Sequence, residues 1–378
     1  MKILHLITSI NNGGAENHVA DLAMSQSKIG HQVYVYYFKG NGYWKSKLTK
    51  NKVKVLKLKK NDEYRDIFYF PYTFLFLLYL IKKYKFNVVH AHLPLMEILA
   101  SFTLIFFPKI KFIISKHLDN SFISGSNTKE NNNNLFLSLF IEKWIINRSH
   151  KCIAISSSVK KFFIKNYGVK KNKIDVIYYG IDTKKFQKNS KDKIINKHKL
   201  INKNKNFLIL GTIARLVEQK NISLILKALS VYKKQGHKFR YYIMGDGPKL
   251  KQLVKNCDEL GITKEVKFLG YSLKTKSFLQ NIDVFCLSSN YEGLGMVLLE
   301  AMSTKVPIIA TNTSAIPEIV TKKCGLLFKK NDHNDLLRKI KKFSNVKLRK
   351  HYATKAYKRV EKYFTLKKCL NKVINLYN

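Results

Sequence analysis

The stretch DVFCLSSNYEGLGMVLLEAMSTKVPIIATNTSAIPE, from Asp283 to Glu318, indicates the fold most clearly. An apolar run over Val284–Leu287 predicts a short buried strand, and a helix is expected over Met296–Ser303. A second apolar run, Val306–Ala310, predicts another strand. Buried strands that alternate with helices are typical of a parallel sheet with helices on both faces, so we predict an α/β fold here.

The same alternation extends over both halves of the chain. One series of apolar strands begins at Lys2–Ile7 and a second begins at Phe207–Ile213. Between them, the polar and Lys-rich stretch Lys184–Asn206 marks a change in composition. A chain of 378 residues also suits two hydrophobic cores better than one. We therefore predict two Rossmann-like α/β domains, 1–185 and 186–354, facing each other across a cleft.

The charge of the chain bears on its partners. The formal net charge is +46, from 70 Lys and Arg against 24 Asp and Glu. So basic a surface attracts polyanions and anionic lipid. The basic residues are spread over the whole chain, and no helix-turn-helix, zinc-finger or ribonucleoprotein signature is present. We therefore expect no nucleic-acid partner and favour an anionic membrane surface.

Cysteine usage and apolar runs bear on the compartment. The five cysteines are odd in number, far apart and include no Cys-x-x-Cys pair, which argues against a disulfide framework or a zinc site and fits a reducing cytosol. The apolar run Ile67–Ile81 is shorter than the ~20 residues that a spanning helix needs. We expect a cytoplasmic protein with a buried helix here. The alternative is an aromatic helix in the membrane interface, which would make the protein peripheral at the inner face of the cytoplasmic membrane.

The start of the helix at Met296 has features suited to a phosphate ligand. Gly293 and Gly295 precede it and would let a phosphate approach the backbone closely. The first amides of the helix, at Met296 and Val297, have no partner within it, and the helix dipole favours an anion there. We predict that a phosphate group binds at this helix start.

Two glutamates flank the same helix start. Glu300 lies one turn inside the helix, where it could accept hydrogen bonds from two ribose hydroxyls, and Glu292 on the loop would face a sugar. As the carboxylate pair of a glycoside hydrolase they would lie about 12 Å apart along a helix, whereas a retaining hydrolase needs about 5–5.5 Å. The spacing therefore favours two separate binding roles.

Two cations follow the first strand of the second series. Arg215 and Lys220 lie in the loop between that strand and the next helix, at the edge of the sheet where open α/β folds bind ligands. Arg would bind a diphosphate as a bidentate fork and Lys as a point charge. In a chain with 70 Lys and Arg the alternative is a pair of surface cations.

The first strand of the chain leads into Gly13 and Gly14. This pair is not the Gly-x-Gly-x-x-Gly of a dinucleotide site, and the second strand ends without an acidic residue for a ribose hydroxyl. Both absences argue against a nicotinamide dehydrogenase. Histidines at predicted strand ends, His90, His92 and His117, raise the question of a metal. Because the sequence lacks His-x-x-x-His and Asp-x-Asp spacings, we expect no metal and no other cofactor.

Taken together, these motifs resemble the retaining glycosyltransferases of family four. The resemblance rests on the Glu292 to Glu300 pattern, on Arg215 with Lys220, and on three short motifs in the family's order. These are Gly13-Gly14-Ala15-Glu16, Tyr178-Tyr179-Gly180-Ile181-Asp182 and Gly245-Asp246-Gly247-Pro248. The resemblance implies the GT-B fold, in which a C-terminal helix, here within 355–378, packs back on the N-terminal domain.

The resemblance also implies roles for individual residues. Arg215 and Lys220 would hold the diphosphate of a nucleotide-sugar, Glu300 its ribose and Glu292 its sugar. Gly13 and Gly14 would lie near phosphate and acceptor, and His117 by the reacting carbon. The remaining donor-site positions implied by the motifs are Gly245, Gly293, Gly295, Met296 and Val297. One departure is the Asn-rich loop Asp119–Asn134, which is longer than the family pattern. Its position just after His117 leaves room for a lid over the cleft, and the alternative is a surface insertion without a function.

The function that the resemblance implies is transfer of a sugar, with retention, from a nucleoside-diphosphate sugar. We expect a UDP-sugar donor and a saccharide acceptor, lipid-linked, in the synthesis of a bacterial capsule, O-antigen or lipopolysaccharide. Two alternatives stay open: a nucleotide-sugar epimerase of the same fold, and a non-catalytic polyanion-binding protein.

Overall fold

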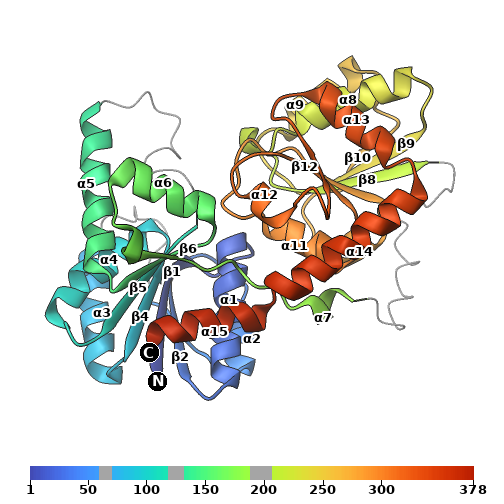
Figure 1. Cartoon of the computed structure of the whole chain (residues 1–378). Coiled ribbons are helices and arrows are strands. Elements are labelled where there is room, and N and C mark those ends of the chain that lie inside the picture. The colour runs from blue at the N-terminus through green and yellow to red at the C-terminus, as the bar shows by residue number, and fades with distance from the viewer. Residues whose placement is uncertain (59–69, 118–131, 188–206) are drawn as a thin grey trace. The chain divides into compact units, whose positions relative to one another are not determined.

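Two parallel sheets organise the chain, one in each half (Figure 1). The computed structural model describes residues 1–58, 70–117, 132–187 and 207–378. These divide into unit 1, which comprises Met1–Gly180 and Leu366–Asn378, and unit 2, which comprises Ile181–Thr365. The predicted pair of Rossmann-like domains is confirmed.

The sheet of unit 1 has seven strands in the order β3-β2-β1-β4-β5-β6-β7, and every neighbouring pair is parallel. The strands are β1 (Lys2–Ser9), β2 (Gln32–Lys39), β3 (Lys54–Leu56), β4 (Val88–His92), β5 (Lys111–Lys116), β6 (Lys151–Ala154) and β7 (Ile174–Val176). From β1 the next strands along the chain are added toward one edge of the sheet, and from β4 onward they are added toward the other edge, so the strand order reverses between β1 and β4. In open α/β sheets ligands bind at the carboxyl ends of the strands beside such a reversal.

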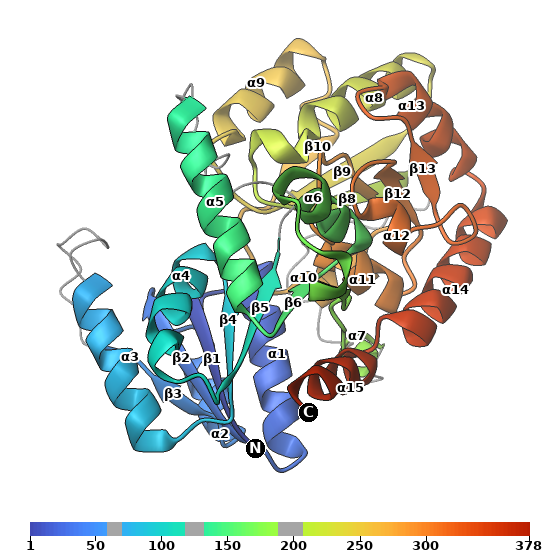
Figure 2. The ribbon, with the colours of Figure 1, turned by 60° about the vertical axis from the view of Figure 1, so that its left-hand side comes forward.

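Helices cover both faces of this sheet. Figure 2 shows α3, α4 and α5 on one face and α1 and α15 on the other. The helices of unit 1 are α1 (Gly14–Lys28), α2 (Lys45–Lys50), α3 (Phe70–Tyr84), α4 (Pro94–Thr103), α5 (Asn132–Arg148), α6 (Ser157–Tyr167) and α15 (Leu366–Tyr377). Local chemistry sets their ends: the Ser156 hydroxyl accepts a hydrogen bond from the Val159 amide and caps α6, which Gly168 terminates in the left-handed conformation.

The C-terminal helix α15 belongs to unit 1, as the resemblance implies. Its residues Leu370, Val373 and Tyr377 are buried in the core beside α1. The expectation of one helix within 355–378 is wrong, however. Residues up to Tyr363 continue α14 (Val346–Tyr363) of unit 2, and α15 begins only at Leu366.

The sheet of unit 2 has six parallel strands in the order β10-β9-β8-β11-β12-β13, with the same reversal, here between β8 and β11. Its strands are β8 (Leu208–Ile213), β9 (Phe239–Met244), β10 (Val266–Phe268), β11 (Val284–Leu287), β12 (Ile308–Thr311) and β13 (Leu326–Phe328). Its helices are α7 (Thr183–Phe186), α8 (Ile222–Lys234), α9 (Leu250–Glu259), α10 (Thr275–Gln280), α11 (Met296–Ser303), α12 (Ile316–Ile319), α13 (His333–Lys342) and α14.

The limits of the two units differ from the predicted 1–185 and 186–354. The division falls after Gly180, because Ile181 bonds to residues that precede α15: its amide donates to Phe364 O over 2.9 Å, and it forms a β-bridge with Thr365. Residues 119–131 of the predicted lid and 188–206 of the polar stretch lie outside the described residues. α5 begins at Asn132, so the end of the predicted loop is helical instead.

Candidate functional site

Three loops of unit 2 meet at the carboxyl edge of its sheet. In the sheet, β8 lies between β9 and β11. The loop after β8 carries Arg215, the loop after β9 carries Gly245, and the loop after β11 carries Glu292. These three predicted donor-site residues therefore share the edge at which the strand order reverses, where ligands bind in folds of this kind.

Lys220 and Glu292 form an ion pair that the sequence did not predict. Lys220 Nζ lies 2.6 Å from Glu292 Oε1, and the Ser289 hydroxyl donates to the same oxygen over 2.6 Å. Only 18% of the lysine side chain and 9% of the glutamate side chain are exposed. An ammonium group has three protons, so Lys220 can hold Glu292 and still donate to a second acceptor.

The backbone around Lys220 is fixed by the loop after β11. The Ser288 hydroxyl lies 2.9 Å from the carbonyl oxygen of Lys220 and 2.8 Å from that of Asn221. The Asn290 amide also donates to Gln219 O over 2.7 Å. Asn221 directly precedes α8 as its N-cap residue and has a positive φ of 44°. This role of Ser288 was not predicted from the sequence, although its place directly after a buried strand was the available signal.

Gly245 allows the loop after β9 to lie against the loop that carries Arg215. Its φ is +141°, and a Cβ on it would lie 1.8 Å from the carbonyl oxygen of Ala214. The Leu216 amide donates to Asp246 O over 2.8 Å across the same contact. Arg215 itself is exposed, and its side chain has no partner among the described residues. The loop is therefore held while the guanidinium faces solvent.

The start of α11 keeps its amides available. Gly295 precedes the helix in the left-handed conformation with a φ of +85°, and no side chain caps the first turn. Met296 and Val297 are half-buried there, and Glu300 is half-buried one turn further on. Gly293 is buried in the preceding loop. The geometry at this helix start suits the predicted anion.

The two glycines after β1 in unit 1 have different surroundings. A Cβ on Gly13 would lie 2.3 Å from Glu16 Oε2, whereas a Cβ on Gly14 would meet nothing within 4 Å. Glu16 turns back over Gly13 because the Ser9 hydroxyl donates to Glu16 Oε1 over 2.9 Å. Gly13 thus serves the packing of Glu16, and Gly14 is the glycine that leaves open space.

His117 follows β5 and is held by an aromatic pair. Its Nδ1 is hydrogen bonded to Tyr179 Oη, and the ring of Tyr179 stacks on His18 with centroids 3.7 Å apart. Burial, with the nearby charge of Lys116, lowers the pKa of His117 to about 3, so the imidazole is neutral near pH 7. Its Nε2 has no hydrogen-bond partner among the described residues. Tyr179 belongs to one of the motifs of the resemblance, but no role for Tyr179 or His18 was predicted from the sequence.

Three more histidines form a buried network behind His117. One ring nitrogen from each of three buried histidines, His5, His90 and His92, lies within 4.8 Å of the other two, a spacing that could hold a metal. His5 Nδ1 lies 3.1 Å from His92 Nε2, and His90 Nδ1 lies 2.6 Å from Tyr377 Oη. The second ring nitrogen of His5 faces Gln26 Oε1 at 2.7 Å, and that of His90 faces Ser115 Oγ, also at 2.7 Å. A metal would have to displace these hydrogen bonds, so the metal-free site stays our prediction.

Two family models of known proteins match this chain. Residues 12–185 match the family model for Glycosyltransferase Family 4, and residues 191–359 match the model for Glycosyl transferases group 1. The chain belongs to this glycosyltransferase family. Together the two models cover most of the chain; the first lies mainly in unit 1 and the second lies within unit 2.

Relatives of this glycosyltransferase include proteins of bacterial surface polysaccharides. It is 29% identical to the capsular polysaccharide biosynthesis glycosyltransferase CapM of Staphylococcus aureus, over 64% of this chain and 65% of CapM. It is 27% identical to the O-antigen biosynthesis glycosyltransferase WclY of Escherichia coli, over 60% of this chain and 61% of WclY. The match thus spans less than two thirds of either relative.

Solved structures share the fold over the whole chain. Anabaena Alr3699/HepE in complex with UDP aligns with a TM-score of 0.82 and 20% identity, over 99% of both chains. The sucrose-phosphate synthase of Thermosynechococcus elongatus aligns with a TM-score of 0.80 and 16% identity, over 100% of this chain and 98% of its own. The likeness confirms the GT-B fold.

Proposed function

We propose that this glycosyltransferase transfers a sugar from a UDP-sugar to a saccharide acceptor, with retention, during synthesis of a bacterial surface polysaccharide. The observation that carries the proposal is the Lys220–Glu292 pair, fixed at the carboxyl edge of the unit 2 sheet and followed by the uncapped start of α11. The names of CapM and WclY support the product class, and the UDP in the Alr3699/HepE structure supports the donor class.

The leaving diphosphate gains negative charge as the bond to the sugar breaks. Donors fixed in advance around such a charge make the largest contribution to many enzymatic rates. Here Lys220 is oriented by Glu292, and the amides at Met296 and Val297 are uncapped. Arg215 is an exposed guanidinium on a loop that Gly245 holds in place. We assign the diphosphate to these groups, the ribose to Glu300 and the sugar to Glu292, without a metal.

Retention is assigned to attack on the face from which the diphosphate leaves. The alternative is a covalent intermediate on Glu292. Its Oε1 already accepts hydrogen bonds from Lys220 and Ser289, which makes this oxygen a poor nucleophile. We assign His117 a hydrogen-bonding role by the reacting carbon, because its imidazole is neutral and its Nε2 has no partner among the described residues.

A panel of nucleotide sugars tests the donor assignment. We expect one UDP-sugar to raise the melting temperature and to be consumed only when a saccharide acceptor is added, with NMR showing the donor's anomeric configuration in the product. A changed sugar released without acceptor would favour an epimerase. Salt-sensitive nucleic-acid binding with no donor binding would favour the polyanion-binding protein. Trapping a glycosyl adduct on Glu292 would overturn same-face attack.

The acceptor proposal rests on an apolar surface of unit 1. Tyr72, Leu75 and Tyr79 are more than half exposed along one side of α3. Phe106, also exposed, contacts this helix through Phe74, with ring centroids 6.3 Å apart. An aromatic surface on a basic protein suits an anionic membrane. At the membrane surface the enzyme would reach a lipid-linked saccharide acceptor.

A sedimentation assay with vesicles tests the membrane surface. Vesicles with anionic lipid should carry the protein down at low salt, and Tyr72→Ser with Tyr79→Ser should weaken the association. No helix of the described residues is both long and apolar enough to cross a membrane. Failure to sediment at low salt would remove the membrane proposal and leave the donor assignment standing.

A further inference from the structure

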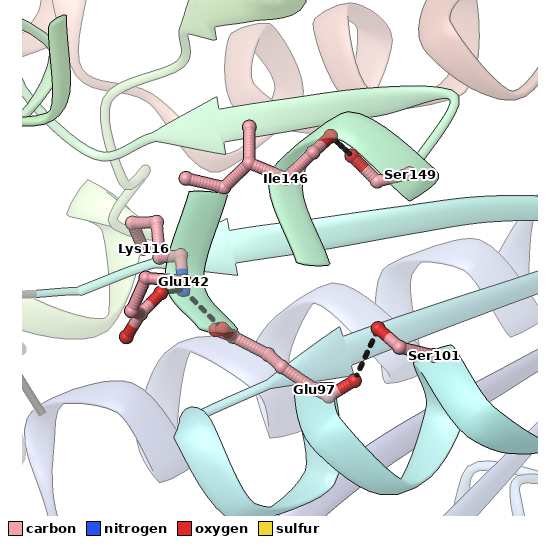
Figure 3. Close-up of polar contacts among 6 residues, drawn as sticks. All are labelled: Glu97, Ser101, Lys116, Glu142, Ile146 and Ser149. Carbon is pink, nitrogen blue, oxygen red and sulfur yellow. Dashed lines mark hydrogen bonds and ion pairs between the residues drawn. The ribbon is translucent and has the colours of Figure 1, made fainter. Parts of the chain in front are cut away.

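A buried ionic cluster lies directly behind His117. Lys116, the last residue of β5, forms ion pairs with Glu97 of α4 and Glu142 of α5 (Figure 3). At most 5% of any of the three side chains is exposed. None of the three residues has a role in the proposed transfer, yet buried ionic groups are costly to keep, so their presence calls for an explanation.

The cluster has one cation for two carboxylates. Burial raises the pKa of Glu97 to about 7. The positive charge of Lys116 lowers this pKa, and the negative charge of Glu142 raises it further. Burial alone would lower the pKa of Lys116, but the two carboxylates keep it above its ordinary value. The other groups packed on Lys116 are neutral: the ring of Phe163 from α6, 5.2 Å away, and the thiol of Cys152 from β6, whose pKa burial raises. Lys116 therefore stays charged and held from two helices.

The cluster joins two strand ends that carry histidines. Lys116 immediately precedes His117, and Glu97 lies in the first turn of α4, which follows His92 at the end of β4. Leu93, the single residue between β4 and α4, has a φ of +70°, a strained conformation for a residue with a side chain. Such strain persists only where surrounding contacts hold the backbone, and the Glu97 to Lys116 pair supplies one of them.

We propose that Lys116, Glu97 and Glu142 are positioning residues that fix His92 and His117 at the carboxyl edge of the unit 1 sheet for the transfer reaction. This inference rests on the proposed function, in which His117 lies by the reacting carbon. The cluster ties the ends of β4 and β5 to each other and to α5, so that His117 Nε2 keeps one position without a direct contact to these carboxylates.

The kinetic test uses Glu97→Gln, Lys116→Met and Lys116→Arg. Misplacing a group at the reacting centre can cost up to about 100-fold in rate. We expect Lys116→Met and Glu97→Gln to lower kcat roughly 10- to 100-fold, with the KM for the donor unchanged, because unit 2 residues hold its diphosphate. Lys116→Arg should recover part of the loss, since it restores the charge. Lys151→Met, which breaks the half-exposed ion pair with Asp175 in the same unit, is the matched control and should keep full kcat.

A second readout does not depend on turnover. The His117 Hε1 resonance, assigned by its loss in His117→Asn, should shift in Glu97→Gln and Lys116→Met and remain in place in Lys151→Met. If the wild-type protein transfers no sugar but this shift is seen, the proposed function fails and the positioning role stands. If folded Glu97→Gln keeps both kcat and the His117 resonance, the positioning role is wrong. Glu97→Gln retains shape and a hydrogen bond, so it decides the question even where Lys116→Met does not fold.

Discussion

The sheets of unit 1 and unit 2 share one strand order over six strands, to which unit 1 adds β7, but the side chains at the carboxyl ends of their sheets differ in charge. In unit 2 the edge presents the Lys220–Glu292 pair and an exposed Arg215. In unit 1 it presents the buried imidazole of His92 and the half-buried imidazole of His117. Desolvation keeps both neutral, and the ions of the Lys116 cluster lie behind them. A leaving diphosphate needs fixed cations, whereas a sugar hydroxyl needs neutral hydrogen-bonding groups, so the contrast fits a division of labour between the units.

The largest expected effect comes from removing the cation of unit 2. Lys220→Ala should lower kcat by about 10²–10³-fold, because it deletes a donor to the departing diphosphate. It also removes the ion-pair partner of Glu292. Arg215→Ala should lower kcat as well. Steady-state kinetics at saturating donor measure both.

Lys233→Ala is the matched control for Lys220→Ala. It breaks another lysine–glutamate pair of unit 2, in which Lys233 Nζ lies 2.9 Å from Glu265 Oε2 on the surface. Its kcat should equal that of the wild type. If Lys220→Ala and Arg215→Ala both kept full kcat, the ionic site of unit 2 would have no part in the reaction.

Acid should destabilise unit 1 through its neutral histidines. Burial lowers the pKa of His5 to about 4, while an unfolded histidine titrates near 6.5. Between these values the unfolded chain binds a proton that the folded chain does not, so stability falls as the pH drops from about 6.5 to 4, by up to about 3 kcal/mol for this residue. Glu97 acts in the opposite sense, because its raised pKa favours the folded state as the pH falls from about 7. It is one group, however, against seven histidines of unit 1 whose pKa values are lowered.

Tryptophan fluorescence can follow this acid effect in unit 1 alone, because both tryptophans of the chain, Trp44 and Trp144, lie there. The midpoint temperature of the fluorescence transition should fall steadily below pH 6.5. His351→Gln, at an exposed position of α14, is the control and should keep the same pH dependence. A flat profile between pH 6.5 and 4.5 would mean that the unit 1 histidines already bind protons in the folded state.

Substitution of a glycine at the carboxyl edge of each sheet should cost different amounts of folding stability. Gly245→Ala places a Cβ 1.8 Å from a backbone oxygen at a φ of +141°, so the β9 loop must shift, at a cost of about 2–3 kcal/mol. Gly14→Ala meets open space and should change stability little. Thermal unfolding followed by circular dichroism measures both, and equal losses would mean that the Gly245 loop yields easily.

The alternation of strands and helices was readable from the sequence, because strands buried on both faces are continuous apolar runs. The break between α14 and α15 was not, since residues 364–365 contain neither Gly nor Pro. The β-bridge between Ile181 and Thr365 occurs there, and it depends on tertiary structure. Local sequence carries no sign of such a contact.

The same limit applies to the ionic groups. The sequence placed Lys220 and Glu292 at one sheet edge but not in contact, because 72 residues separate them and only the folded loops bring them together. Lys116 was missed because one lysine among 70 basic residues resembles a surface cation. Its place at the end of the apolar run Lys111–Ile114 was the only signal, and recognising it required the facing carboxylates of α4 and α5.

The smallest expected effects compare one hydroxyl in each unit. Tyr179→Phe removes the partner of His117 Nδ1 in unit 1, and Ser288→Ala removes the hydroxyl that holds Lys220 O and Asn221 O in unit 2. Each should cost about 1 kcal/mol, the net contribution of a typical hydrogen bond. Tyr179→Phe should lower the midpoint of the tryptophan transition, while Ser288→Ala should lower only the circular dichroism transition of unit 2. A common shift of both signals in both variants would show that the units unfold together. The two sites would then depend on a single free energy of unfolding for the whole chain.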